Sequence, residues 1–294
     1  MRPPIRVEHS VSFAIRAAAA ALTAAGIESA RLDAEILAAA ALEIARAQVL
    51  IFAGHFPAAA QHRFEAFVAR RATREPLAYI TGRKEFFSLE FEVNPAVLIP
   101  RPETETLVAA ALETLRRGKT RAVMRVLELG IGSGAIAIAL AVNEPRVEIV
   151  ATDISRAALA VAARNAVRHG VADRIRFEPS DLWPAIGDMA ARFDLVVSNP
   201  PYIVRSELAA LAPEIAEYEP LIALDGGADG LDFYRRIAAE LHSYLSSDGQ
   251  LLVEVGADQA AAIISIFEDR SATALSTIKD LAGHQRVVAA SFGG

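Results

Sequence analysis

The chain of 294 residues is long enough for two domains. Its formal net charge of −6 argues against the binding of polyanions through bulk charge. It has no cysteine, and its six histidines show no metal-ligand spacing; disulfides and cysteine nucleophiles are therefore excluded, and no metal site is predicted.

The N-terminus carries two arginines, Arg2 and Arg6, ahead of an alanine-rich stretch at residues 17–26. This order resembles a signal peptide, but Glu8 and Arg16 interrupt the pattern. We therefore predict an amphipathic helix here. A membrane span needs about 18 apolar residues in a row, and the sequence contains no such run.

Residues 10–75 have the pattern of a small helical bundle. Ser10 and Ser29 precede the first two helical runs and are predicted to be their N-caps. Gly26 is predicted to end the first. The four predicted helices cover residues 10–25, 30–45, 48–54 and 58–74.

Residues 78–98 differ from this bundle. The alternation in "SLEFEV" and the aromatic residues around it predict paired strands that form a hairpin linking two domains. The segment "LIPRPETE" follows, and Pro102 suits the first position of a helix whose first turn is acidic.

From residue 125 onward, apolar strand-like runs alternate with helical runs. This alternation is typical of a mainly parallel sheet with helices on both faces, so the predicted fold class is α/β. Ligands of such sheets bind at the carboxyl ends of the strands. The predicted strands cover residues 125–130, 147–153, 175–181, 193–198, 249–256 and 284–292, and the predicted helices cover residues 134–143, 156–170, 232–246 and 258–269.

A glycine loop, "LELGIGSGAIA", joins the first of these strands to its helix. Glycines let the backbone turn sharply and approach a ligand closely, and the helix N-terminus offers free N–H groups. Asp153 ends the next strand, where a carboxylate can accept from both hydroxyls of a ribose. The pattern suits NAD as well as S-adenosylmethionine, and a plain tight turn is the structural alternative.

Glu128, just before the loop, favours one of these ligands. A carboxylate beside a pyrophosphate would place anion next to anion. It suits a ligand that carries an ammonium and a sulfonium group, so Glu128 favours S-adenosylmethionine over NAD.

The third strand ends in "SDL". Asp181 can accept from an adenine amino group while Leu182 lines the ring. A capping or turn aspartate before "WPA" explains the same residues equally well.

The segment "NPPY" follows the fourth strand at the same edge of the sheet. Methyl transfer to a planar amide or aromatic amine needs the weak nucleophile to be positioned. The oxygen of Asn199 and a main-chain carbonyl held by Pro200 can accept its two N–H groups, and Pro201 adds rigidity without a competing donor. Tyr202 offers a flat face for stacking. An asparagine-initiated turn is the structural alternative.

At these residues and at further segments, the chain resembles the HemK/PrmC family of protein-(glutamine-N5) methyltransferases, which modify peptide chain release factors. The resemblance is carried by residues 75–105 with "LIPRPETE", by "LELGIGSGAIAIAL", by "SNPPYI", and by "GQLLVEVG" and "QRVV" near the end. It spans nearly the whole chain, including the helical start. NPPY alone is less specific, because amino-group DNA and RNA methyltransferases share it.

The resemblance implies a Rossmann-like class I methyltransferase domain preceded by a small helical domain and a hairpin linker. Its boundaries are expected at residues 1–76 for substrate recognition, 77–100 for the linker and 101–294 for catalysis. The implied cofactor is S-adenosyl-L-methionine, which leaves as S-adenosyl-L-homocysteine. Two positions depart from the family: Glu128 stands where aspartate is frequent, and Ile131 where a small polar residue is common.

The expected roles combine this resemblance with the arguments above. The expected cofactor contacts are Glu128, Gly130, Ile131, Gly132, Ser133, Gly134, Asp153, Asp181, Leu182 and Asn199. The expected substrate contacts are Asn199, Pro200, Pro201 and Tyr202, with Asn199, Pro200 and Tyr202 as the catalytic residues and no general base.

The implied reaction methylates the side-chain nitrogen N5 of the glutamine in a Gly-Gly-Gln sequence of a release factor. The chain is expected to be a cytoplasmic monomer that binds neither nucleic acid directly nor membranes. The alternative enzyme methylates an exocyclic amine of a nucleic-acid base, of the N6-adenine type, and predicts a basic groove. A non-catalytic binding module with a relic cofactor site is the third hypothesis.

Overall fold

The computed structural model describes residues 10–52, 54–117, 122–185 and 192–292. The chain forms two compact units: Met1–Gly82 with Ala212–Tyr218, and Arg83–Leu211 with Glu219–Gly294. Arg2, Arg6 and Glu8, which precede the predicted helix, lie outside the described residues. In the described part of the chain, no helix is long and apolar enough to cross a membrane.

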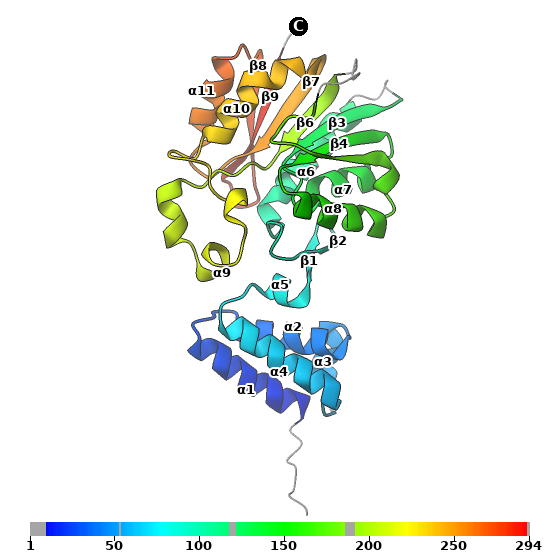
Figure 1. Ribbon diagram of the computed structural model, residues 1–294, viewed down its shortest axis with the longest axis vertical. Coiled ribbons are helices and arrows are strands. Elements are labelled where there is room, and N and C mark those ends of the chain that lie inside the picture. Colours follow the sequence, from blue (N-terminus) through cyan, green and yellow to red (C-terminus); the bar gives the residue numbers. More distant parts are fainter. Residues whose placement is uncertain (1–9, 53, 118–121, 186–191, 293–294) are drawn as a thin grey trace, which may run out of the picture. The chain divides into compact units, whose positions relative to one another are not determined.

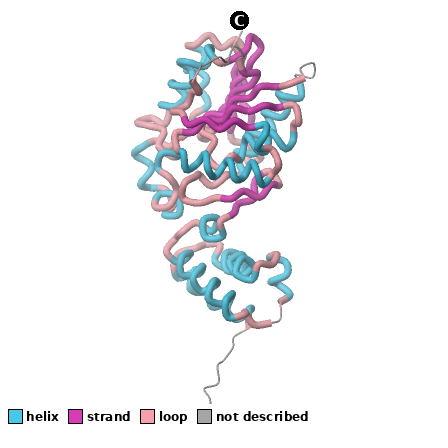
Figure 2. Tube along the Cα trace, turned by 45° about the vertical axis from the view of Figure 1, so that its right-hand side comes forward, coloured by secondary structure: helices cyan, strands magenta, loops and turns pink. Residues whose placement is uncertain are grey.

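The first unit is a bundle of short helices, as its apolar spacing predicts (Figures 1 and 2). Its core contains the buried side chains of Leu22, Leu37 and Phe64. The helices are α1 (Val11–Ala24), α2 (Ala30–Leu42), α3 (Arg46–Ile51), α4 (Ala58–Ala72), α5 (Leu77–Thr81) and α9 (Pro213–Ala216).

The two predicted helix caps have different outcomes. The Ser10 side chain accepts from the Phe13 N–H, which confirms it as the N-cap of α1. Ser29 is the N-cap residue of α2, as predicted, but its side chain makes no capping hydrogen bond; its hydroxyl donates to the Asp33 carboxylate at 2.8 Å instead. Asp33 is buried, and a buried carboxylate requires donors.

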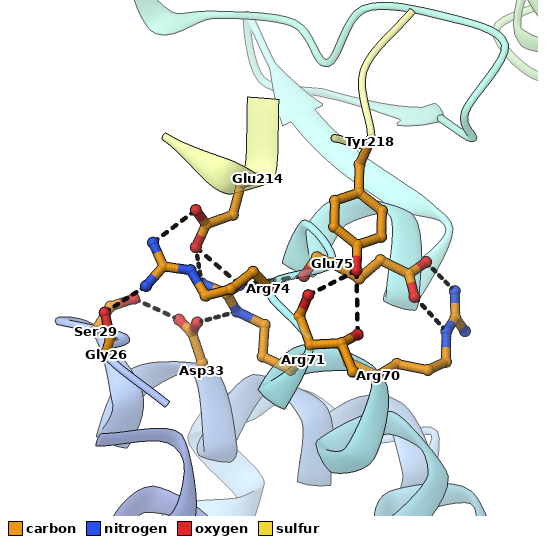
Figure 3. A network of polar contacts seen from close by, with 10 residues as sticks. Gly26, Ser29, Asp33, Arg70, Arg71, Arg74, Glu75, Glu214 and Tyr218 are labelled. Carbon is orange, nitrogen blue, oxygen red and sulfur yellow. Dashed lines mark hydrogen bonds and ion pairs between the residues drawn. The ribbon is translucent and has the colours of Figure 1, made fainter. Parts of the chain in front are cut away.

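A polar network within this unit joins the bundle to the segment Ala212–Tyr218 (Figure 3). Buried Arg71 pairs with Asp33 at 2.8 Å and with Glu214 at 3.1 Å. Arg74 pairs with the second Glu214 oxygen at 2.7 Å. A segment far along the chain is thereby held on the bundle, which the sequence pattern did not predict.

The second unit begins with a hairpin of β1 (Arg83–Phe86) and β2 (Leu89–Glu92), which are antiparallel, as predicted. Residues 87 and 88 between them both have positive φ, as in the turns of two-residue hairpins. The prediction that strand structure begins at residue 78 is wrong. Leu77–Thr81 is the helix α5, because Pro76 precedes it and Gly82 ends it in the left-handed conformation.

A seven-stranded sheet forms the centre of the second unit, in the order β5-β4-β3-β6-β7-β9-β8. The first five strands of this order are parallel to one another, and β9 is antiparallel to both of its neighbours, β7 and β8. The predicted α/β class is confirmed. The exposed edge strand β8 was not predicted. The strands are β3 (Met124–Leu129), β4 (Val147–Asp153), β5 (Ile175–Pro179), β6 (Phe193–Ser198), β7 (Leu245–Glu254), β8 (Ala274–Lys279) and β9 (Gln285–Ser291).

Helices cover both faces of this sheet (Figure 1). One layer is formed by α6 (Glu105–Arg117), α7 (Ala135–Asn143) and α8 (Arg156–Arg168), and the other by α10 (Asp232–Glu240) and α11 (Ala260–Glu268). The 3-10 turns are η1 (Pro102–Thr104), η2 (Ala172–Arg174), η3 (Arg205–Ala210), η4 (Leu221–Ala223) and η5 (Leu241–Ser243).

Two predictions concern the ends of these helices. Pro102 is the first residue of η1, which leads directly into α6, and this confirms its predicted position. The prediction that one helix runs over residues 232–246 is wrong. The helix ends at Glu240, and β7 begins at Leu245, because the Tyr244 carbonyl accepts from the Phe193 N–H of β6 and pairs the chain with the sheet.

Candidate active site

A pocket of about 310 Å³ lies at the carboxyl ends of β3, β4, β5 and β6, and residues of the second unit alone line it. This is the edge of the sheet at which ligands of parallel α/β folds bind. Eleven of the predicted site residues line the pocket: Glu128, Gly130, Ile131, Gly132, Ser133, Asp153, Asp181, Leu182, Asn199, Pro200 and Pro201. Gly134 and Tyr202 lie outside this lining.

The glycine loop has two kinds of glycine. A Cβ placed on Gly132, at a φ of 54°, would meet no atom within 4 Å, so the ligand side of the loop is open. A Cβ on Gly134 would lie 2.8 Å from Ile138 Cδ1 and 3.2 Å from Ala162 Cβ. Gly134 therefore permits the packing of α7 against α8 and serves as the left-handed N-cap of α7.

Asp153 closes the loop from the end of β4. One carboxyl oxygen accepts from the Gly132 N–H at 2.9 Å and the other from the Ser155 N–H at 2.8 Å. Burial raises the pKa of this carboxyl, while the two backbone donors lower it. Each oxygen of a carboxylate has a second acceptor site, so Asp153 can still accept from the hydroxyls of a ligand.

Glu128 lies behind the loop and is 1% exposed. Its carboxylate accepts from the N–H of Ala137 in the first turn of α7 at 2.8 Å. Burial raises the pKa of Glu128 well above its ordinary value, and nearby Asp153 adds to the effect. A cationic ligand in the pocket would oppose both influences and favour the ionised form.

The two residues predicted at the carboxyl end of β5 have different surroundings. Asp181 lies at the pocket, but its carboxylate pairs with Arg236 of α10 at 2.8 Å. Leu182 is nearly buried, has a φ of 68°, and accepts at its carbonyl from the Thr152 hydroxyl. The Leu182 side chain is thus fixed at the pocket, whereas Asp181 is partly neutralised by an exposed cation.

NPPY extends directly from β6 into the pocket. The side-chain nitrogen of Asn199 donates to the Thr104 hydroxyl of η1 at 3.1 Å, so Thr104 does not occupy the side-chain oxygen of Asn199. Pro200 and Pro201 line the pocket beside it.

Contacts of its own backbone hold Tyr202 behind the part of the pocket that Pro200 and Pro201 line. Its carbonyl accepts from Gln259 at 2.9 Å, and a Cβ on Gly226 would lie only 2.7 Å from the Tyr202 Cα. Burial raises the pKa of Tyr202 to about 12, with nearby Glu254 as the second cause, so the phenol is neutral at physiological pH. Its position supports the main chain of NPPY.

Several residues at this site were not found from sequence. Arg101 lines the pocket and pairs with buried Glu219 at 2.5 Å, and Glu219 also accepts from the Ile99 N–H. Thr104 is the partner of Asn199. The segment "LIPRPETE" signalled this region, but no pattern near Glu219 signalled its pairing with residues more than a hundred positions earlier.

A metal site receives no support from geometry. Within the described ranges 10–52, 54–117, 122–185 and 192–292, no group of three potential ligands among His, Asp and Glu is close enough to hold an ion. The pocket lining includes the buried carboxyl of Glu128 and the side-chain amide of Asn199.

Comparisons with known proteins match both units. Residues 14–82 match the family described as PrmC N-terminal domain, and residues 106–217 match the methyltransferase small domain. The release factor glutamine methyltransferase of Geobacter sulfurreducens is 45% identical and covers 91% of this chain and 92% of its own length. That of Cereibacter sphaeroides is 43% identical and covers 94% and 96%, respectively.

The solved structures include a match for the fold. The hMettl16 catalytic domain, in complex with the MAT2A 3′UTR hairpin 6, has a TM-score of 0.55. It is 15% identical and covers 80% of this chain and 81% of its own. A match at this identity supports the shared fold alone.

Proposed function

The chain belongs to the family of release factor glutamine methyltransferases, and on that premise we propose that it methylates the side-chain nitrogen N5 of the glutamine in the Gly-Gly-Gln motif of peptide chain release factors. The proposed methyl donor is S-adenosyl-L-methionine. The observation that carries the proposal is the position of Asn199 in the same pocket as the glycine loop and Asp153.

The residues of the pocket fit the proposed cofactor. The open side of Gly132 leaves room for a ligand against the backbone, and Asp153 has free acceptor capacity for ribose hydroxyls. Buried Glu128 suits a cation, and Leu182 offers an apolar contact for an adenine ring. When bound, the cofactor would supply an electrophilic methyl group on a sulfonium.

The proposed work of the protein is to position a poor nucleophile. An amide nitrogen is planar because its lone pair is delocalised, and two acceptors on its N–H groups hold it in place. We assign these roles to the Asn199 oxygen and the Pro200 carbonyl. Proline lacks an N–H, so Pro200 and Pro201 add no donor that competes with the substrate.

The proton balance needs no general base before transfer. Bond formation between the amide nitrogen and the methyl carbon leaves a cationic N-methyl amide, which is strongly acidic. It loses its proton to water, and the sulfur keeps the electron pair of the broken bond.

Partners follow from this proposal. The first unit, with the segment Ala212–Tyr218, is proposed to recognise the body of the release factor. The enzyme would act in the cytoplasm as a monomer, without direct contact to nucleic acid or membranes. The proposed functional boundaries remain residues 1–76, 77–100 and 101–294.

The test uses S-adenosylmethionine with a labelled methyl group. We expect label in an intact release factor and none in a version whose Gly-Gly-Gln glutamine is replaced by alanine. DNA and RNA are offered in parallel. Label that enters nucleic acid and neither protein would refute the proposal.

A further inference from the structure

Glu254, at the carboxyl end of β7, is a buried acid beside the pocket that has no role in the reaction described above. It is 1% exposed. Neither carboxyl oxygen has a hydrogen-bond partner of standard geometry in the described part of the chain. A buried polar group without partners costs free energy, and a native structure retains few of them.

Strand register places Glu254 next to Asn199. In the parallel pair of β6 and β7, Val197 is paired with Leu252 and Ser198 with Val253. The next residues along the two strands are Asn199 and Glu254. Because side chains alternate along a strand, both project to the face opposite Val253, which packs in the core beneath α10 and α11.

Thr104 connects the two side chains. The Asn199 amide donates to the Thr104 oxygen at 3.1 Å, and Thr104 is itself buried. Its hydroxyl still has a proton to donate. The Thr104 and Asn199 side chains both lower the pKa of Glu254, so they favour its ionised form even though neither reaches standard hydrogen-bond geometry.

The orientation of Asn199 matters for the proposed chemistry. An asparagine amide turned by 180° presents its NH₂ group where its oxygen would otherwise lie. Two NH₂ groups facing each other form no hydrogen bond. A substrate glutamine is therefore held only when the Asn199 oxygen faces it.

We propose that Glu254 is a positioning residue for the methyl transfer proposed above: its ionised carboxylate accepts from Thr104 and thereby keeps the Asn199 oxygen turned toward the substrate. A protonated Glu254 is itself a donor. It no longer takes the proton of the Thr104 hydroxyl, so this hydroxyl can turn and donate to the Asn199 oxygen, and the orientation of the amide is no longer fixed. The ionised form is therefore the active one.

The groups around Glu254 set the pH at which this change occurs. The pKa of Glu254 is raised to about 7: burial is the main cause, Thr104 and Arg286 of β9 lower the pKa, and Glu103 of η1 raises it. Arg286 is in turn paired with Asp280 at 3.1 Å. Burial, with Glu254 as the second cause, raises the pKa values of the Tyr202 and Tyr234 phenols, so both stay neutral near pH 7.

The test compares the wild type with Glu254→Gln, which keeps the shape but always carries a donor. We expect its kcat on a release factor to fall roughly 10- to 100-fold, as for a misplaced reacting group. The wild-type kcat should fall as the pH drops through about 7, and this limb should be absent from Glu254→Gln. The dissociation constant for S-adenosylmethionine, measured by calorimetry, should change little.

Thr104→Val removes the connecting hydroxyl at nearly constant volume. If Thr104 and Glu254 act together, the double variant with Glu254→Gln should be no slower than the slower single variant. Thr104→Ser returns the hydroxyl and should recover most of the loss. Additive losses in the double variant, or a Glu254→Gln enzyme with the kcat and pH profile of the wild type, would overturn the inference.

A second measurement does not depend on activity. Carbon NMR of protein labelled at its glutamate carboxyls follows the titration of Glu254, assigned by its absence from Glu254→Gln. Thr104→Val should raise this pKa, and an unchanged titration would overturn the inference. A wild type that labels no release factor would refute the proposed function alone, because the NMR titration still decides whether Thr104 acts on Glu254.

Discussion

The amide nitrogen of Asn199 donates to the hydroxyl of Thr104 at 3.1 Å, across a sequence separation of 95 residues. This contact joins the two most distinctive motifs of the chain, "IPRPETE" and "NPPY", at one pocket. The two motifs therefore contribute to one site, and the first prediction tests the role of Asn199 in it.

Asn199→Ala removes the proposed acceptor for the substrate amide. We expect methyl transfer to fall by about 100-fold or more, since removal of one aligned hydrogen-bonding group from an active site has such effects. Binding of S-adenosylmethionine, followed by calorimetry, should stay mostly intact. Full activity of this variant would refute the role of Asn199.

Asp153→Asn tests the proposed ribose contact. A hydrogen bond to a charged acceptor contributes about 1.5–3 kcal/mol, so we expect S-adenosylmethionine to bind roughly 10- to 150-fold more weakly. The matched control is Asp173→Asn, because Asp173 is an exposed aspartate of η2 away from the pocket lining. Equal affinities in both variants would contradict the assignment.

Two glycines of the loop should respond differently to alanine. Gly134→Ala should lower the free energy of unfolding, because its Cβ would lie 2.8 Å from Ile138 at a φ of 85°. Gly132→Ala has open space toward the pocket and should weaken cofactor binding more than it weakens the fold. Urea unfolding and calorimetry on both variants separate the two effects.

Burial of Glu254 predicts a pH dependence of stability. Its pKa is about 7 in the folded protein against an ordinary 4.5, so the folded state binds more protons between these values. The contribution of Glu254 to the free energy of unfolding therefore falls as the pH rises from 4.5 to 7, by about 3 kcal/mol. The difference between wild type and Glu254→Gln in urea unfolding, followed from about pH 4 to about pH 8, should show this fall. A constant difference would contradict it.

Glu214→Ala should loosen the segment Ala212–Tyr218 from the bundle, because Glu214 is the carboxylate that accepts from both Arg71 and Arg74 (Figure 3). We expect faster amide hydrogen exchange throughout this segment. Glu217→Ala is the matched control, since Glu217 is an exposed glutamate of the same segment. Equal exchange in the two variants would show that the network does not hold the segment.

Much of the fold could be predicted because the relevant signals are local. Periodicity and caps indicated the helices of the bundle, and the alternation after residue 125 indicated the α/β sheet. The errors lie where tertiary pairing overrides a local pattern. Tyr244 and Leu245 continue a helical pattern, yet their backbone joins β6 and β7. Ser29 has the right position for a cap, yet a buried Asp33 takes its hydroxyl.

The sequence by itself determined most of the predicted residues that gather at the pocket, because parallel strands bring their carboxyl ends to one edge and the motifs follow those strands. Only the tertiary structure decided how each side chain is used. Glu128 supports the start of α7, Asp181 pairs with Arg236, and Glu254 is buried beside Asn199. These outcomes depend on burial and on partners distant in the chain, and both arise from packing that no local pattern encodes.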